Sequence, residues 1–151
     1  MDYKTNYESV NMMLSGVIED CPHRIANMAN ASAVLFQELK DLNWAGFYLY
    51  EGGKLVLGPF QGKVACIEIE LGRGVCGTAA EKRETVLVPD VHQFAGHIAC
   101  DGASNSEIVV PIVKDGQLLG VLDIDSPVLN RFSKEDQVGL EKFVEILKQG
   151  L

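Results

Sequence analysis

The sequence contains no long hydrophobic run and no export signal. Nowhere do about 18 apolar residues follow one another, which is the length that a helix needs to cross a lipid bilayer. The first residues, MDYKTNYESVNMMLSGVIED, lack a basic segment followed by an apolar one, so they do not resemble a secretory signal peptide. We therefore expect a cytoplasmic protein without a membrane partner.

Basic residues are few compared with acidic ones. Among 151 residues there are 13 Lys and Arg against 21 Asp and Glu, which gives a formal net charge of -8. Proteins that bind nucleic acid neutralise its phosphates with Lys and Arg. The composition therefore argues against a nucleic-acid partner and favours a small soluble ligand.

Internal repeats and Pro- or Ser-rich linkers are also absent, and hydrophobic residues make up 47% of the chain. That apolar fraction is ordinary for a globular protein, and a chain of this length can bury one full core. Residues 1–151 are therefore predicted to form a single domain.

The cysteines do not have the spacing of a metal site. They form no C-x-x-C pair, and the histidines supply no second pair of ligands at a spacing typical of zinc. The residues concerned are Cys66, Cys76, Cys100, His92 and His97. We therefore predict neither a metal nor a cofactor. In a chain without an export signal most thiols stay reduced, so a permanent disulfide framework is not expected.

Three cysteines have informative surroundings. Cys100 lies in the polar, glycine-containing run GHIACDGASNSE, where a thiol is not needed for packing. Cys76 follows a glycine turn that opens a short helix, a position that lowers a thiol pKa. Cys21, predicted to lie on a helix and followed by Pro22, is interpreted as structural.

Apolar periodicity predicts an α+β fold of two helices, antiparallel strands and a closing helix. The predicted helices cover residues 7–20, 23–42, a short segment within 72–84, and 133–150. The predicted strands cover residues 43–50, 55–60, 63–72, 85–90, 106–113 and 117–127. The closing helix begins with the capping pattern Ser133-x-x-Asp136.

The run 63–72 alternates apolar and polar residues. Ala65, Ile67 and Ile69 are expected on an apolar face of a strand, and Cys66 on the opposite face. The hexapeptide GRGVCG that follows matches G-x-G-x-x-G, and Asp90 ends the next strand, as in a dinucleotide site. Because the preceding run is acidic and hairpins replace βα units, a structural glycine turn is the favoured interpretation.

Three carboxylates are predicted to share one face of the second hairpin, with Asp123 and Asp125 on the same strand. A two-residue turn at 115–116 would place Glu107 opposite Ile124, which mixes acidic and apolar side chains. A three-residue loop at 114–116 would place Glu107 opposite Asp123 and would keep Leu118 on the apolar face. We favour the second register because a one-residue slip moves core residues to the wrong side.

Such a carboxylate cluster has two interpretations. On a solvated sheet face it would have no special role, although clustered like charges repel one another there. In a partly buried pocket the same repulsion raises the pKa of at least one carboxyl, which then supplies an acid near neutral pH.

Trp44, Gly46 and Tyr48 share one face of the first predicted strand. They form either part of an aromatic core or a wall for a ligand with a methyl group or a positive charge. The pattern alone does not decide between these two interpretations.

Four segments together closely resemble the free methionine-(R)-sulfoxide reductases, which are single GAF-domain enzymes. The segments are NWAGFYLY, GPFQGKVACIEIELGRGVCGTAA, VPDVHQFAGHIACDGASNSEIVVPI and GVLDIDSP. The resemblance spans nearly the whole chain. It implies a GAF fold, in which a central antiparallel sheet has helices on one face and a ligand pocket on the other.

The resemblance also implies the substrate, the reductant and the site residues. The substrate would be free methionine-(R)-sulfoxide and the reductant thioredoxin, and a homodimer is left open. By position, Cys100 corresponds to the catalytic cysteine, Cys66 to its resolving partner and Cys76 to an auxiliary third. The substrate-binding residues would be Glu107, Asp123, Asp125, Trp44 and Tyr48.

The chemistry explains these residue types. The Cys100 thiolate would attack the sulfoxide sulfur while one of the three carboxylic acids protonates the oxygen, which leaves a sulfenic acid. Cys66 would convert the sulfenic acid into a disulfide that a dithiol reduces. The sequence does not decide which carboxylate carries the proton or which disulfide accumulates.

Two other functions stay open on the residues alone. A GAF domain without enzymatic activity would bind a small ligand and signal through its helices, although such sensors normally carry an output domain and this chain ends at Leu151. A peroxide-sensing thiol protein would oxidise without selectivity for a sulfoxide. A reducible intramolecular disulfide formed on addition of methionine sulfoxide would favour the enzyme over the ligand sensor.

Overall fold

The computed structural model describes residues 3–96 and 102–151. Its centre is a six-stranded antiparallel sheet in the order β3-β2-β1-β6-β5-β4. The strands are β1 Trp44–Glu51, β2 Lys54–Gly62, β3 Glu68–Glu70, β4 Val86–Val88, β5 Ser106–Lys114 and β6 Gln117–Ser126. The α-helices are α1 Tyr7–Ile18, α2 Arg24–Glu38, α3 Gly74–Lys82 and α4 Lys134–Leu147. The predicted α+β fold with a central antiparallel sheet is confirmed.

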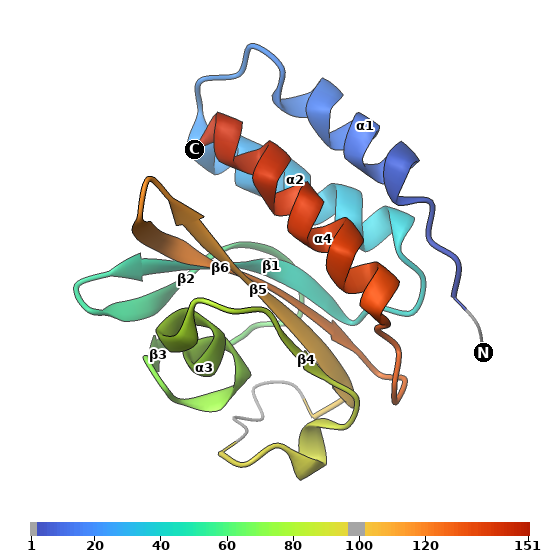
Figure 1. Ribbon diagram of the computed structural model, residues 1–151, viewed down its shortest axis with the longest axis vertical. Helices are drawn as coiled ribbons and strands as arrows, with labels where there is room; N and C mark the ends of the chain where they lie inside the picture. The colour runs from blue at the N-terminus through green and yellow to red at the C-terminus, as the bar shows by residue number, and fades with distance from the viewer. Residues whose placement is uncertain (1–2, 97–101) are drawn as a thin grey trace.

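The sheet separates two layers of helices, as Figure 1 shows. Helices α1, α2 and α4 cover one face, and their apolar side chains pack with the strand residues that point to the same side, including Phe47, Leu122 and Ile124. The short helix α3 lies on the other face, where Trp44 and Tyr48 belong to a second buried cluster. Strand alternation therefore supplies a core on one side and a site on the other.

The helix ends follow local sequence signals. Asn6 caps α1, since its side chain accepts a hydrogen bond from the Ser9 amide at 3.0 Å. The predicted cap of α4 is confirmed: Ser133 and Asp136 form a reciprocal capping box at its first turn. A side chain that satisfies an otherwise unpaired amide of the first turn stabilises a helix by about 1 kcal/mol.

The predicted register of the second hairpin is wrong. Its turn has two residues, with Lys114 opposite Gln117, but a β-bulge between Ile112 and Val113 then shifts the pairing, so Glu107 lies opposite Asp125 and Ile108 opposite Ile124. With the bulge, the observed pairing differs from the predicted one by two residues, since Glu107 lies opposite Asp125 instead of Asp123. A shift by an even number keeps each side chain on its face, so the three carboxylates still share a face. Leu118 packs on the α3 side, whereas we expected it on the other face.

The alternation predicted for 63–72 extends over three residues only. Strand β3 covers Glu68–Glu70, and Ile67 is 71% exposed although its side chain was expected in the core. Cys66 was expected to point away from the apolar face, but it packs against the buried cluster on the α3 side, as does Ala65. The Ile67 carbonyl still accepts a hydrogen bond from the Leu57 amide of β2 at 2.9 Å, but regular strand pairing begins only at Glu68.

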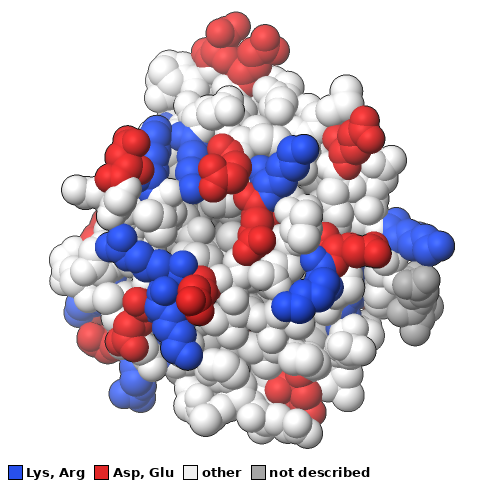
Figure 2. All heavy atoms as spheres, in the orientation of Figure 1, with Lys and Arg blue, Asp and Glu red and all other residues white. Residues whose placement is uncertain are grey.

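The surface carries charges of both signs. Figure 2 shows acidic and basic side chains interspersed over the face in view, without a large area of one sign. No helix of the described part is long and apolar enough to cross a lipid bilayer.

Candidate active site

A small pocket of about 50 Å³ lies on the α3 side of the sheet. Its walls come from strands β1, β3, β5 and β6, from the loop before β3 and from the first turn of α3. The lining residues are Trp44, Tyr48, Val64, Ala65, Ile69, Arg73, Gly74, Val75, Cys76, Ser104, Glu107, Asp123 and Asp125. All five residues that the sequence predicted to bind substrate are among them.

The central strands bring the carboxylates together. In the ladder, Trp44 of β1 pairs with Asp125 of β6, which pairs in turn with Glu107 of β5, and Gly46 pairs with Asp123. Glu107 and Asp123 are each 6% exposed. Three acidic side chains from adjacent strands therefore line one pocket, and two of them are buried.

Burial changes the acidity of this cluster. Loss of hydration raises the pKa of Glu107 well above that of an ordinary glutamate, and the negative charges of Asp123 and Asp125 raise it further. A raised pKa keeps a carboxyl group protonated near neutral pH. The shift has the direction that the carboxylate cluster predicted, toward a group that keeps its proton at higher pH than an ordinary glutamate.

Cys76 does not have the activated thiol that its helix position suggested. The thiol is in the first turn of α3, but it is only 6% exposed. Burial raises its pKa well above the usual value, and the charges of Asp123 and Glu107 act in the same direction. Desolvation and neighbouring carboxylates therefore outweigh the helix dipole, whose effect near a helix end is about 0.3–1 kcal/mol.

Among the described residues, one group could supply three ligands to a metal ion. It consists of Cys76, Glu107 and Asp123, whose potential ligand atoms lie within 4.8 Å of one another. A thiolate and two carboxylates are ligands that zinc accepts. The expectation from the sequence concerned only cysteines and histidines as metal ligands, so it did not include this set.

Aromatic side chains of β1 line the pocket beside the acids of β6. The ring of Trp44 stacks on that of Phe60 at 5.1 Å and lies 5.9 Å from that of Tyr48. The Trp44 indole N–H donates to the Lys63 carbonyl at 3.1 Å, and the Tyr48 hydroxyl donates to the Cys66 carbonyl at 2.9 Å. Both rings are therefore fixed at their polar ends, and they contribute apolar surface to the lining of the pocket.

The cysteines divide into three kinds. Cys66 is partly buried and disulfide-bonded, whereas the free cysteines among the described residues are Cys21 and Cys76. Cys21 lies in the connection between α1 and α2, so its predicted helical position is wrong. Cys100 and His97 lie outside the described residues.

The G-x-G-x-x-G run has a structural role. Gly72 and Gly74 have φ of +82° and +64°, and a Cβ on Gly77 would lie 2.4 Å from the Glu70 carbonyl oxygen. Asp90, the acid of the fingerprint, accepts a hydrogen bond from the His92 amide at 3.0 Å. The glycines are thus required by the turn and by close packing, as the favoured interpretation stated.

Arg73, Gly74 and Ser104 were not assigned to the pocket from the sequence. Arg73 and Gly74 line it from the start of α3, and Ser104 lines it while accepting a hydrogen bond from the Asn43 side chain at 3.0 Å. The position of Arg73 inside the glycine turn was the available signal. Nothing in the sequence pattern indicates the pairing of Asn43 with Ser104.

The antiparallel sheet and the pocket beneath α3 define a GAF domain, and residues 26–151 match the family model described as "GAF domain". The chain is 52% identical over 145 residues to free methionine-R-sulfoxide reductase of Escherichia coli strain K12, which covers 96% of this chain and 88% of that protein. Its structure is similar to fRMsr of Staphylococcus aureus in its reduced form (TM-score 0.96, 51% identity, 100% and 99% of the two chains). It is also similar to free methionine-R-sulfoxide reductase of Neisseria meningitidis in complex with its substrate (TM-score 0.92, 44% identity, 95% and 87%). The chain therefore belongs to the free methionine-R-sulfoxide reductase family of GAF-domain proteins.

Proposed function

We propose that this protein reduces free methionine-(R)-sulfoxide to methionine, with residues 1–151 acting as a single GAF domain. The observation that carries the proposal is the pocket: a buried carboxylic acid, two further carboxylates and an aromatic wall converge in a member of the reductase family. Such a set matches a zwitterionic amino acid whose side chain ends in a methyl sulfoxide.

The two ends of the substrate have complementary partners in the pocket. Asp123 and Asp125 would bind the α-ammonium group, and the α-carboxylate would lie at the first turn of α3, near Arg73 and Gly74. Amide N–H groups at a helix start favour an anion. Trp44 would pack on the S-methyl group and favour the partial positive charge on sulfur. The demand for both charged ends explains why a free amino acid, and not a residue within a peptide, would be bound.

The chemical step requires a nucleophile and an acid at once. The Cys100 thiolate would attack the sulfoxide sulfur while the protonated Glu107 donates its proton to the oxygen. The sulfoxide gains two electrons and leaves as methionine, and the cysteine loses two electrons and becomes a sulfenic acid.

The second step closes the cycle. The Cys66 thiol would attack the sulfenic acid and release water, which produces a Cys66–Cys100 disulfide. The participation of Cys66 in a disulfide supports this pairing. A dithiol such as thioredoxin would then reduce the disulfide by exchange and restore both thiols.

Release of methionine from separate R and S sulfoxides, with a thioredoxin system, tests the proposal. We expect turnover of the R form alone, no turnover by Cys100→Ser, and a single equivalent of methionine from Cys66→Ser. Cys21→Ser is the matched control and should keep the parent rate. Full turnover by Cys100→Ser, or none by the freshly reduced parent, would contradict the proposed function.

A further inference from the structure

A second cavity, of about 230 Å³, lies between the N-terminal segment, the start of α1 and the end of α2. It shares no lining residue with the candidate active site. The residues that line it are Tyr3, Lys4, Thr5, Asn6, Ser9, Val10, Glu38, Lys40 and Arg131. We call this space the Arg131 cavity.

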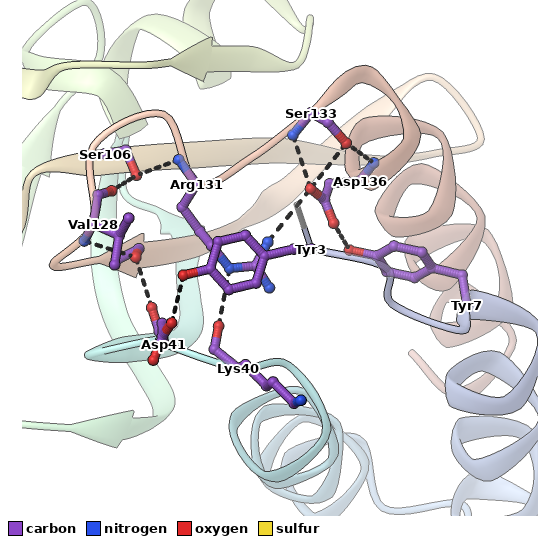
Figure 3. Close-up of polar contacts among 10 residues, drawn as sticks. Tyr3, Tyr7, Lys40, Asp41, Ser106, Val128, Arg131, Ser133 and Asp136 are labelled. Carbon is purple, nitrogen blue, oxygen red and sulfur yellow. Dashed lines mark hydrogen bonds and ion pairs between the residues drawn. The ribbon is translucent and has the colours of Figure 1, made fainter. Parts of the chain in front are cut away.

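Arg131 is the most unusual of these residues, because its side chain is 0% exposed. Figure 3 shows its guanidinium group beneath the ring of Tyr3, which lies 3.9 Å from the guanidinium carbon. Its Nε donates to the Lys40 carbonyl at 2.9 Å, and its Nη1 lies 3.5 Å from Asp136 Oδ2. Neither terminal nitrogen of the group has a hydrogen-bond partner among the described residues.

Asp136 offsets the charge of Arg131 as an ion pair, but it accepts no hydrogen bond from the terminal nitrogens, and its oxygens have other donors. Asp136 accepts hydrogen bonds from the Tyr7 hydroxyl at 2.5 Å, from the Ser133 amide at 2.8 Å and from the Ser133 hydroxyl at 3.1 Å. A buried donor without an acceptor costs about 1–3 kcal/mol, and more when it is charged. The guanidinium therefore has capacity for an acceptor that the described chain does not supply.

The lining of the cavity is basic in an acidic protein. Among the lining residues, Lys4, Lys40 and Arg131 contribute three positive charges and Glu38 one negative charge, while Asp136, the ion-pair partner of Arg131, lies outside the lining. The whole chain carries a formal charge of -8. A cavity of this size is smaller than the roughly 300–1,000 Å³ of typical metabolite and drug pockets. It nevertheless has room for several water molecules, at about 30 Å³ each.

We propose that the Arg131 cavity binds a small oxyanion, a phosphate or a carboxylate. One oxygen would accept a hydrogen bond from Arg131 Nη2, and Lys4 and Lys40 would neutralise the remaining charge. Guanidinium groups pair well with oxyanions because their N–H groups match the spacing of the oxygens. Tyr3 covers the guanidinium, so binding moves its ring, and the site is independent of the proposed reductase activity.

Titration with inorganic phosphate at low ionic strength tests the site, with acetate and chloride as parallel arms. We expect saturable amide shifts in two-dimensional NMR spectra, confined to residues 3–10, 38–41 and 131. Lys40→Ala should weaken binding about tenfold, since one of the cavity's charges is lost. Lys40→Arg should restore it. Lys82→Ala, which removes one exposed charge far from the cavity, should leave affinity unchanged.

The oxyanion proposal has clear contrary outcomes. Shifts that are equal in phosphate and chloride, or that spread over the whole surface, would overturn it. Equal losses in Lys40→Ala and Lys82→Ala would overturn it as well, because general charge screening would then be the cause. Saturation by phosphate without acetate would identify a phosphate site, and saturation by both an oxyanion site. Because Arg131→Met removes a buried side chain and can disturb the fold, the comparison of Lys40→Ala with Lys82→Ala decides the result.

Discussion

Glu107 shows how one residue links the pocket to stability. Its raised pKa means that the folded protein holds a proton that the unfolded chain releases above the usual glutamate pKa of about 4.3. The folded state then binds more protons than the unfolded state, so stability falls as pH rises from there through the raised folded pKa. Glu107→Gln, which resembles the protonated acid, removes this loss.

We therefore expect the melting temperature of Glu107→Gln to exceed that of the parent by about 3 °C or more at pH 8. At pH 4 the two proteins should melt at nearly the same temperature, because the Glu107 side chain of the parent is then mostly protonated in both states. Melting curves across this pH range provide the measurement, and Glu51→Gln at an exposed position controls for the lost charge. A difference that is constant with pH would show that Glu107 is not a protonated acid in the folded state.

Cys76 and Cys21 should differ in reactivity, although both are free thiols. The thiolate is the reactive form, and burial raises the pKa of Cys76 while closing it to reagents. Iodoacetamide at pH 7.5 should modify Cys21 at least about tenfold faster than Cys76 in the folded protein. Mass spectrometry of digested samples measures both rates, and unfolding in guanidinium should make them similar. Rapid modification of Cys76 in the folded protein would contradict this expectation and would support the reactive thiol that its position at a helix start predicts.

At the level of elements, the sequence predicts which face each carboxylate occupies better than it predicts the pairing. Alternation alone places Asp123 and Asp125 on one side, and this survives any even shift of register. The bulge at Ile112 could not be foreseen, because a hairpin with or without an extra residue satisfies the same apolar pattern. Ile67 was misassigned for a similar reason: its period matches a strand, but regular pairing with β2 begins only at Glu68 and the Ile67 side chain is 71% exposed.

The glycine turn before α3 offers a matched pair of substitutions. A Cβ on Gly77 would approach a backbone oxygen to 2.4 Å, whereas nothing lies within 4 Å of a Cβ on Gly16 in α1. Gly77→Ala should lower the free energy of unfolding by about 1–3 kcal/mol. Gly16→Ala should raise it by about 1 kcal/mol, since alanine favours a helix. Urea unfolding measures both, and equal effects would contradict the structural role of Gly77.

On the scale of the whole molecule, Asp136 joins the two ends of the chain. It lies in the first turn of α4, accepts the Tyr7 hydroxyl of α1 and pairs with the buried Arg131 (Figure 3). Removal of one partner from such a buried ion pair costs about 3–5 kcal/mol, because the other charge is left uncompensated.

Asp136→Ala should therefore lower the free energy of unfolding by about 3–5 kcal/mol. Glu135→Ala, an exposed acidic residue in the same helical turn, should change it by less than about 0.5 kcal/mol. Denaturant unfolding of both variants gives the comparison. Similar losses would mean that the helix dipole, and not the buried network, accounts for the contribution of Asp136.

The β-bulge in the second hairpin separates two registers of the β5–β6 pairing, which differ by one residue. With Val113 opposite Leu118 and Ile112 opposite Gly120, Leu119 is the residue without a partner in the ladder. A chain that lost this residue would form a regular hairpin with the same turn, and Glu107 would still face the aspartate that now is Asp125. Deletion of Leu119 should therefore leave the acids of the pocket in their present alignment, although it would remove an apolar side chain that packs on the main core.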